Sequence, residues 1–339
     1  MTDREDGLYD GGVIDPNGVD EADDNIVQPF QLLGTNLRGR VVRLGPELDE
    51  IITAHDYPTP ISHLVAETLT LTLLLSAMLK YDGIFTLQAQ GDGPLSRLVG
   101  DVTSGGEMRA CATFDPERLQ HAREQLGALK SEEGNQNHLA QYLGKGYIAF
   151  TVDQAGGQDR YQGIVELKGS SLTDCVQHYF KQSEQIATGI KMAVGLRGGR
   201  WRAGALMVQH MPEEGGFAGI WAGSKRLGNL DEDGWRRNMI LLGSCTEDEL
   251  LDPDLHSHVL LHRLFHEEGV RVYEPHHVHK SCRCTRERVE NIIKMMPDDD
   301  IEYFVEQGKA EITCEFCSRA YVFSAQEVKA LCGDPPQRG

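Results

Sequence analysis

The sequence predicts an α+β protein in which an antiparallel-sheet core is followed by a helical linker and a small four-cysteine metal module. Segments between residues 26 and 223 alternate apolar and polar side chains and are joined by short turns, which favours antiparallel strands. Residues 224–280 are acidic, rich in histidine and patterned as amphipathic helices. Two close pairs of cysteines follow between residues 281 and 333, with the spacing of a zinc-binding domain.

An acidic tail precedes the core. In residues 1–25, acidic side chains outnumber basic ones nine to one. Such a segment buries too little apolar surface to offset its ordering entropy, so we expect it to be disordered. Its acidic start is unlike the basic and then apolar start of a secretory signal. The longest apolar run, residues 64–79, is too short to cross a bilayer, so we expect a cytoplasmic protein without a membrane partner.

The composition limits the possible functions. The chain has 339 residues, 40% of them hydrophobic and 25% charged, which is typical of a soluble protein of about two domains. Its formal net charge of −19 argues against nucleic-acid binding, because phosphate contacts need clustered Lys and Arg. In a reducing cytosol, isolated cysteines are expected to be small buried hydrophobes. These are Cys111, Cys175, Cys245 and Cys332.

Within the core, the pattern predicts helices at residues 47–55 and 61–80, the second of them apolar on most of its faces. A third helix is expected at residues 172–185, after a serine cap. The alternating segments predict strands at residues 85–90, 108–114, 147–153, 161–167, 191–196 and 203–210. The sequence has no phosphate-binding loop and no nucleophile elbow, so we do not expect an enzyme.

In the linker, residues 224–280, the helix signals are a Thr246–Glu249 capping box, Asp252–Pro253 as a helix start and Gly269 as a stop. The apolar stripes of these helices must be covered by something. His262 and His266 have the spacing of a metalloprotease pair, but an arginine stands where the catalytic Glu would be. We interpret them as helix-face histidines. We likewise assign no ligand role to His276, His277 and His279.

The last module carries Cys282-Arg-Cys284 and Cys314-Glu-Phe-Cys317, with 29 residues between the two motifs. Four thiolates in two pairs suit one tetrahedral Zn²⁺ per chain. A capped helix after Thr285, an acidic helix after Pro297, a hairpin at residues 310–323 and a final helix complete the module. So few residues bury little surface, and metal binding is expected to supply the folding free energy, about 10–16 kcal/mol in small zinc peptides.

Three uses of these cysteines remain open from their spacing. The site is either a permanent structural zinc site, a redox switch whose thiolates are oxidised, or the dithiol of an oxidoreductase. A zinc-ribbon adaptor or nucleic-acid module is a further alternative, which the acidic charge disfavours. A thioredoxin-type pair should begin a helix after a strand, whereas strand-like residues flank Cys314 and Cys317 on both sides.

From about residue 37 to residue 331, the chain resembles the redox-regulated heat-shock chaperone family known as the 33 kDa chaperonin. The resemblance is carried by the two cysteine motifs at the separation of the family and by a set of short core motifs in order. These are His55-Asp-Tyr-Pro58, Leu79-Lys-Tyr-Asp-Gly83, Gln90-Gly-Asp-Gly-Pro94, Arg160-Tyr-Gln-Gly163 and Tyr179-Phe180 with Ser183-Glu-Gln185. The acidic tail lies outside the pattern, and Ala187 stands where family members commonly have Pro.

The resemblance implies an ATP-independent holdase that is inactive while reduced and zinc-bound. Under peroxide and unfolding stress it implies disulfides Cys282 to Cys284 and Cys314 to Cys317, an unfolded linker, a change from monomer to homodimer, and binding of unfolded clients. We hypothesise that linker side chains then become client-binding surface. They are Trp235, Met239, Ile240, Leu255, Val259, Leu260, Leu264 and Phe265.

Overall fold

The computed structural model describes residues 23–35, 37–129, 138–156, 160–184, 186–210 and 231–332. Its contacts divide the chain into two units, residues 1–280 and residues 281–339. The predicted tail up to residue 22, and the predicted boundary between core and linker at residue 223, lie outside the described residues. Asp23, Asp24 and Asn25, which the composition assigned to the tail, are described and make specific contacts with the linker and the core.

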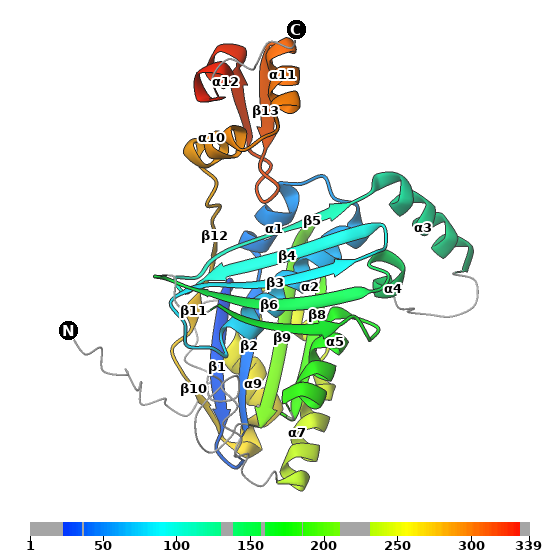
Figure 1. The fold of residues 1–339 in the computed structure, drawn as a ribbon. Helices are drawn as coiled ribbons and strands as arrows, with labels where there is room; N and C mark the ends of the chain where they lie inside the picture. The colour runs from blue at the N-terminus through cyan, green and yellow to red at the C-terminus, as the bar shows by residue number, and fades with distance from the viewer. Residues whose placement is uncertain are drawn as a thin grey trace, which may run out of the picture. The chain divides into compact units, whose positions relative to one another are not determined.

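Two six-stranded sheets form the framework of the first unit (Figure 1). The first sheet has the order β10-β1-β2-β9-β8, and β11 also pairs with β1. Its strands are β1 (Ile26–Leu32), β2 (Leu37–Leu44), β8 (Thr188–Arg197), β9 (Arg200–His210), β10 (Val270–Val272) and β11 (His276–His277). The pairs of this sheet are antiparallel, with Val41 opposite Leu206 in the β2–β9 pair. The sequence predicted β8 and β9 but not β1 and β2.

The second sheet has the order β12-β5-β4-β3-β6-β7, and only the short β12–β5 pair is parallel among its described pairs. Its strands are β3 (Gly83–Gly91), β4 (Leu95–Thr103), β5 (Glu107–Phe114), β6 (Gly146–Gln154), β7 (Tyr161–Glu166) and β12 (His279–Lys280). The α+β class and the antiparallel core are therefore confirmed. The α-helices α3 (Pro116–Leu129) and α4 (His138–Tyr142) lie between β5 and β6 in the chain.

The helix α2 (Thr59–Ser76) lies between the two sheets and is buried nearly all round, as its apolar composition predicted. Its threonine hydroxyls donate to carbonyls one turn back, so these polar groups are satisfied inside the core. A Cβ on Gly100 of β4 would lie 2.5 Å from Thr72 Oγ1, so helix and sheet approach too closely for a larger residue. The helices α1 (Pro46–Thr53) and α5 (Leu172–Tyr179), with a π-helical turn at Phe180–Glu184, complete this layer.

The linker packs on the other face of the first sheet. It contains α7 (Glu232–Ser244), α8 (Glu247–Leu251), α9 (Ser257–Phe265) and a 3₁₀ turn (His266–Glu268). The apolar stripes of these helices are thus covered by the sheet. The side chains of this second core from the sheet are Phe30, Leu32, Leu37, Val41, Ala193, Leu206 and Val208, and those from the linker include Leu242, Leu250, Leu251, Leu260, Leu261, Leu264 and Phe265.

Two details of the linker differ from the prediction. No helix begins at Asp252–Pro253, because Asp252 Oδ1 accepts the Asp254 N–H in a turn. The helix α9 starts later and is capped by His256, whose Nδ1 accepts the His258 N–H. After Gly269, which ends the helical part as predicted with φ +68°, the chain is extended and adds β10, β11 and β12 to the two sheets.

The second unit follows the predicted order of elements. The helices α10 (Arg286–Lys294) and α11 (Asp298–Glu306) precede the hairpin of β13 (Lys309–Thr313) and β14 (Ala320–Ser324), and α12 (Ala325–Cys332) follows. The predicted caps are present, because Thr285 accepts the Arg288 N–H and Ser324 forms a capping box with Glu327. Its buried core is small: Val289, Ile293, Ile301, Ala310, Tyr321, Phe323 and Val328.

Candidate metal centre

The four cysteines of the second unit lie together because two tight local structures point at each other. Cys282 and Cys284 lie on the extended segment directly before α10. Cys314 and Cys317 lie in the turn between β13 and β14, where the Cys314 N–H donates to Arg319 O and the Ser318 N–H to Cys314 O. Ser318 has a φ of +55°, which reverses the chain after the second cysteine. No helix begins at this pair, so its setting is that of a metal knuckle rather than of a thioredoxin-type dithiol.

The spacing of the four sulfurs fits a metal ion. All four Sγ atoms lie within 4.8 Å of one another. The Cys282–Cys314 and Cys284–Cys317 sulfurs are 3.7 and 3.4 Å apart. A tetrahedral Zn²⁺ with Zn–S bonds of about 2.3 Å places its ligand sulfurs about 3.8 Å apart. The cysteines are free thiols, and four soft sulfur donors at these distances could hold a zinc-like ion.

The thiols of the cluster affect one another's ionisation. Burial opposes ionisation of Cys284, but hydrogen bonds from the Tyr321 hydroxyl and from the neighbouring thiols outweigh it and lower the pKa of Cys284 to about 7. Burial, together with the interaction with Cys284, raises the pKa of Cys317, and burial and Cys282 raise that of Cys314. One thiolate therefore disfavours the next in the absence of a cation, and a divalent ion removes that opposition.

Two residues of this site were not found from the sequence. The Tyr321 hydroxyl donates to Cys284 Sγ at 3.2 Å. A hydrogen bond with Tyr321 and the charges of Tyr321, Cys284 and Cys317 raise the pKa of Arg319, so these groups stabilise its cation. The sequence signal was available in principle, since inward-facing residues alternate along β14 and Tyr321 is the first of them after the knuckle. Nothing in the spacing of cysteines pointed to a tyrosine, however.

Replacing Tyr321 with phenylalanine is expected to lower the affinity of the site for zinc roughly tenfold, the scale of a lost hydrogen bond to a metal ligand. The ring would still pack in the small core, so the fold of the unit should remain. Competition with a chromophoric chelator measures the affinity. The matched control is Tyr303→Phe, which makes the same change at a 59% exposed position of the same unit. Equal affinities of the two variants would contradict the assignment.

The hypothesised client-binding residues differ in their exposure. Leu260, Leu264 and Phe265 are buried against the first sheet, where the Phe265 ring stacks on Phe30 with centroids 6.0 Å apart. Trp235, Met239, Leu255 and Val259 are partly buried. Ile240 is 67% exposed, so docking of the linker does not cover it.

The remaining candidates do not belong to the cysteine cluster. His262 on α9 and His266, the first residue of the following 3₁₀ turn, stack on each other, and His266 Nδ1 lies 3.1 Å from His262 O. In the part of the chain that the structure describes, the four cysteines are the group whose atoms could share a metal ion. Cys111, Cys175 and Cys245 are buried, as expected for small apolar side chains, and Cys332 is half-buried.

Comparison with known proteins gives one consistent result. The family model described as "Hsp33 protein" matches residues 25–324. A 33 kDa chaperonin of Caulobacter vibrioides is 37% identical over 303 residues, which are 88% of this chain and 94% of that protein. One of Escherichia coli is 33% identical over 296 residues, or 87% and 90%. A crystal structure of the 33 kDa chaperonin of Thermotoga maritima superposes with a TM-score of 0.72 at 21% identity, covering 91% of this chain and 97% of that one.

Proposed function

The chain belongs to the Hsp33 protein family, and on this basis we propose that it is a chaperone whose client binding is switched on by oxidation of Cys282, Cys284, Cys314 and Cys317. The relatives are named chaperonins, which supports unfolded proteins as partners and agrees with the expectation that the chain is not an enzyme. The observation that carries the redox part of the proposal is the cluster of four free thiols within 4.8 Å.

In the reduced state, the four sulfurs hold one Zn²⁺, which ties the segment before α10 to the β13–β14 turn. Two molecules of peroxide oxidise the four thiolates to two disulfides and, with four protons, yield four molecules of water. A sulfur in a disulfide no longer serves as an anionic ligand, so the ion leaves. The buried core of this unit is only a few side chains, so loss of the metal is expected to unfold it.

We propose the pairs Cys282 with Cys284 and Cys314 with Cys317, as the family resemblance implies. The sulfur distances do not select this pairing, because the contacts of 3.7 and 3.4 Å join the two motifs. Once the unit unfolds, however, only the partners within each motif stay close in the chain. Mass spectrometry of unreduced peptides distinguishes these pairs from disulfides between the motifs.

The linker supplies the client-binding surface in this proposal. Its buried leucines and Phe265 are apolar surface that docking on the first sheet keeps from water. If residues 231–280 undock, both the linker stripes and the sheet face become exposed, and large exposed apolar patches bind other proteins. Oxidised chains that expose such surface are expected to pair as homodimers, as the resemblance implies.

The test is to follow zinc release and suppression of aggregation of a denatured client in parallel, before and after peroxide with mild heat. Zinc release should coincide with the gain of client protection, and ATP should not be required. Equal protection by the reduced, zinc-loaded protein would rule out the switch, and the site would then be a permanent structural staple. Loss of zinc without any client protection would rule out the chaperone function itself.

A further inference from the structure

Two buried arginines of the first sheet face the docked linker. Arg43 on β2 and Arg202 on β9 lie on the same sheet face as Val41 and Leu206. These two residues belong to the second core, which the sheet and the linker share. The side chain of Arg43 is 1% exposed and that of Arg202 is 9% exposed. A buried guanidinium is costly unless charges and hydrogen bonds satisfy it, so the partners of these two residues determine how well the linker docks.

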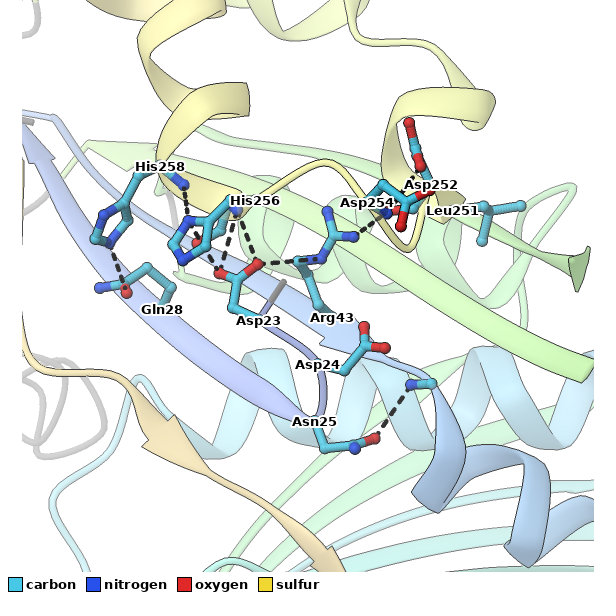
Figure 2. A network of polar contacts seen from close by, with 12 residues as sticks. Asp23, Asp24, Asn25, Gln28, Arg43, Leu251, Asp252, Asp254, His256 and His258 are labelled. Atoms are coloured by element: carbon cyan, nitrogen blue, oxygen red, sulfur yellow. Dashed lines mark hydrogen bonds and ion pairs between the residues drawn. The ribbon is translucent and has the colours of Figure 1, made fainter. Parts of the chain in front are cut away.

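Each arginine holds two partners of the same kinds, and Figure 2 shows those of Arg43. Arg43 lies beside Asp23, with Nε and Oδ1 3.6 Å apart, and donates to the carbonyl of Asp252. Arg202 forms a two-pronged ion pair with Asp24 and donates to the carbonyl of Leu251 at 3.1 Å. Each arginine thus has one acidic side chain from the segment before β1 and one carbonyl from the end of α8, where Leu251 is the last helical residue and Asp252 follows it.

Asp23 also contacts the linker directly. Its two carboxylate oxygens accept the Ser257 N–H at the start of α9, at 2.9 and 3.1 Å. His256 Nδ1 lies 3.7 Å from Asp23, but this nitrogen accepts the His258 N–H and so has no proton to give to Asp23; burial lowers the pKa of His256 more than the Asp23 charge raises it. The charged partner of Asp23 is therefore Arg43. In the described part of the chain, Nε and Nη1 of Arg43 are buried without a hydrogen-bond partner, so this guanidinium has no further hydrogen bond to offset the loss of the Asp23 charge.

Hydrogen bonds of the next residue, Asn25, hold the backbone that carries Asp23 and Asp24. Asn25 Oδ1 accepts the N–H groups of Gly45 and Glu47, and Asn25 O accepts the Val278 N–H. Asp23 and Asp24 are only 11% and 22% exposed in their side chains. Removing one partner of an ion pair at such burial lowers the stability of the docked state, whereas the same change in a surface ion pair has little effect.

We propose that Asp23 and Asp24 form an acidic clasp that is bound in a site shared between the sheet and the linker, and that this clasp holds the linker in its docked state. The site consists of Arg43 and Arg202 from the sheet and of the Leu251, Asp252 and Ser257 backbone from the linker. It is complete only when the linker is docked, so by linkage its occupation favours docking. The regulatory meaning of the clasp rests on the proposed function, whereas its existence does not.

The test is Asp23→Asn combined with Asp24→Asn, which keeps the side-chain shape and removes the charge. The protein is the full chain, reduced and loaded with zinc, and the readout is hydrogen exchange of the linker amides 246–265. We expect exchange in this segment to accelerate about tenfold or more, while amides of β3 and β6 in the second sheet keep their protection. The matched control is Asp248→Asn, which breaks an ion pair with Arg197 that also joins linker and sheet but is 92% exposed on the aspartate side. That control should exchange like the unmodified protein.

Three outcomes would overturn the clasp. They are unchanged linker exchange in the double variant, an equal effect of Asp248→Asn, and a parallel loss of protection in β3 and β6, which would make the variant a general destabiliser. A client-aggregation assay on the same zinc-loaded double variant separates this result from the proposed function. If the linker opens and no client is protected, the clasp stands and the proposed client surface fails.

Discussion

Replacing Cys314 with serine is expected to unfold the C-terminal unit, residues 281–332, while the two sheets of the first unit stay folded. The hydroxyl of serine is a poor zinc ligand at neutral pH, so one corner of the proposed tetrahedron is lost. Metal binding contributes about 10–16 kcal/mol in small zinc-binding peptides. The seven buried side chains of this unit cannot offset such a loss. The measurement is hydrogen exchange resolved by unit, together with the zinc content of the purified protein.

Cys332→Ser is the matched control for this variant. It makes the same substitution in the same unit, but Cys332 lies outside the cluster, and its Sγ is 3.7 Å from Ile293 O. This variant should keep its zinc and its protection from exchange. A Cys314→Ser protein that retains a compact C-terminal unit would show that the fold does not depend on the metal, and the proposed switch would have no structural basis.

Local chemistry was enough to predict this unit. The cysteine spacing indicates the metal site, and the capping residues Thr285 and Ser324 mark helix starts that the structure confirms. The hairpin of β13 and β14, whose turn carries Cys314 and Cys317, is also a short-range feature. Tyr321 was missed because its role depends on a contact with Cys284, 37 residues away.

The core was predicted less completely, for reasons of long-range packing. The strand β2 carries Arg43 on a buried face and Gly39 in its middle, so its alternation is weak in the sequence. The burial of Arg43 is explained by its contacts with Asp23 and with the carbonyl of Asp252, which is 209 residues away in the sequence. The same contact explains the wrong helix start at Asp252–Pro253. The sheet arginines bind the carbonyls of Leu251 and Asp252, which holds this part of the chain in a turn.

Replacing Gly204 with alanine is expected to push the linker off the first sheet without any oxidation. Gly204 lies on the central strand β9, between Arg43 of β2 and Ala193 of β8. A Cβ at this position would lie 2.2 Å from the carbonyl oxygen of Leu250 and 3.1 Å from its Cβ, so the backbone of α8 rests directly on the glycine. A strand paired on both sides cannot yield easily, so α8 must move. Overpacking of this kind costs about 1–3 kcal/mol. Because α8 must move, this cost makes docking of the linker on the sheet less favourable.

Gly243→Ala on α7 is the matched control, because no described atom outside the nearby backbone of its own helix lies within 4 Å of the added Cβ. It should be neutral or should stabilise the helix by up to about 1 kcal/mol. Limited proteolysis of the zinc-loaded proteins measures the difference: cleavage between residues 246 and 265 should accelerate only in Gly204→Ala. Unchanged cleavage would mean that α8 does not rest on this sheet.

The Gly204→Ala variant also separates uncovering of the linker from oxidation of the cysteines. If covered apolar surface is what binds clients, the reduced variant should suppress client aggregation while its four thiols remain bound to zinc. The expected effect is large, because the linker core contains Phe265 and several fully buried leucines. If the linker opens and clients still aggregate until peroxide is added, oxidation must contribute something besides uncovering. The unfolded C-terminal unit itself would then be the client-binding element.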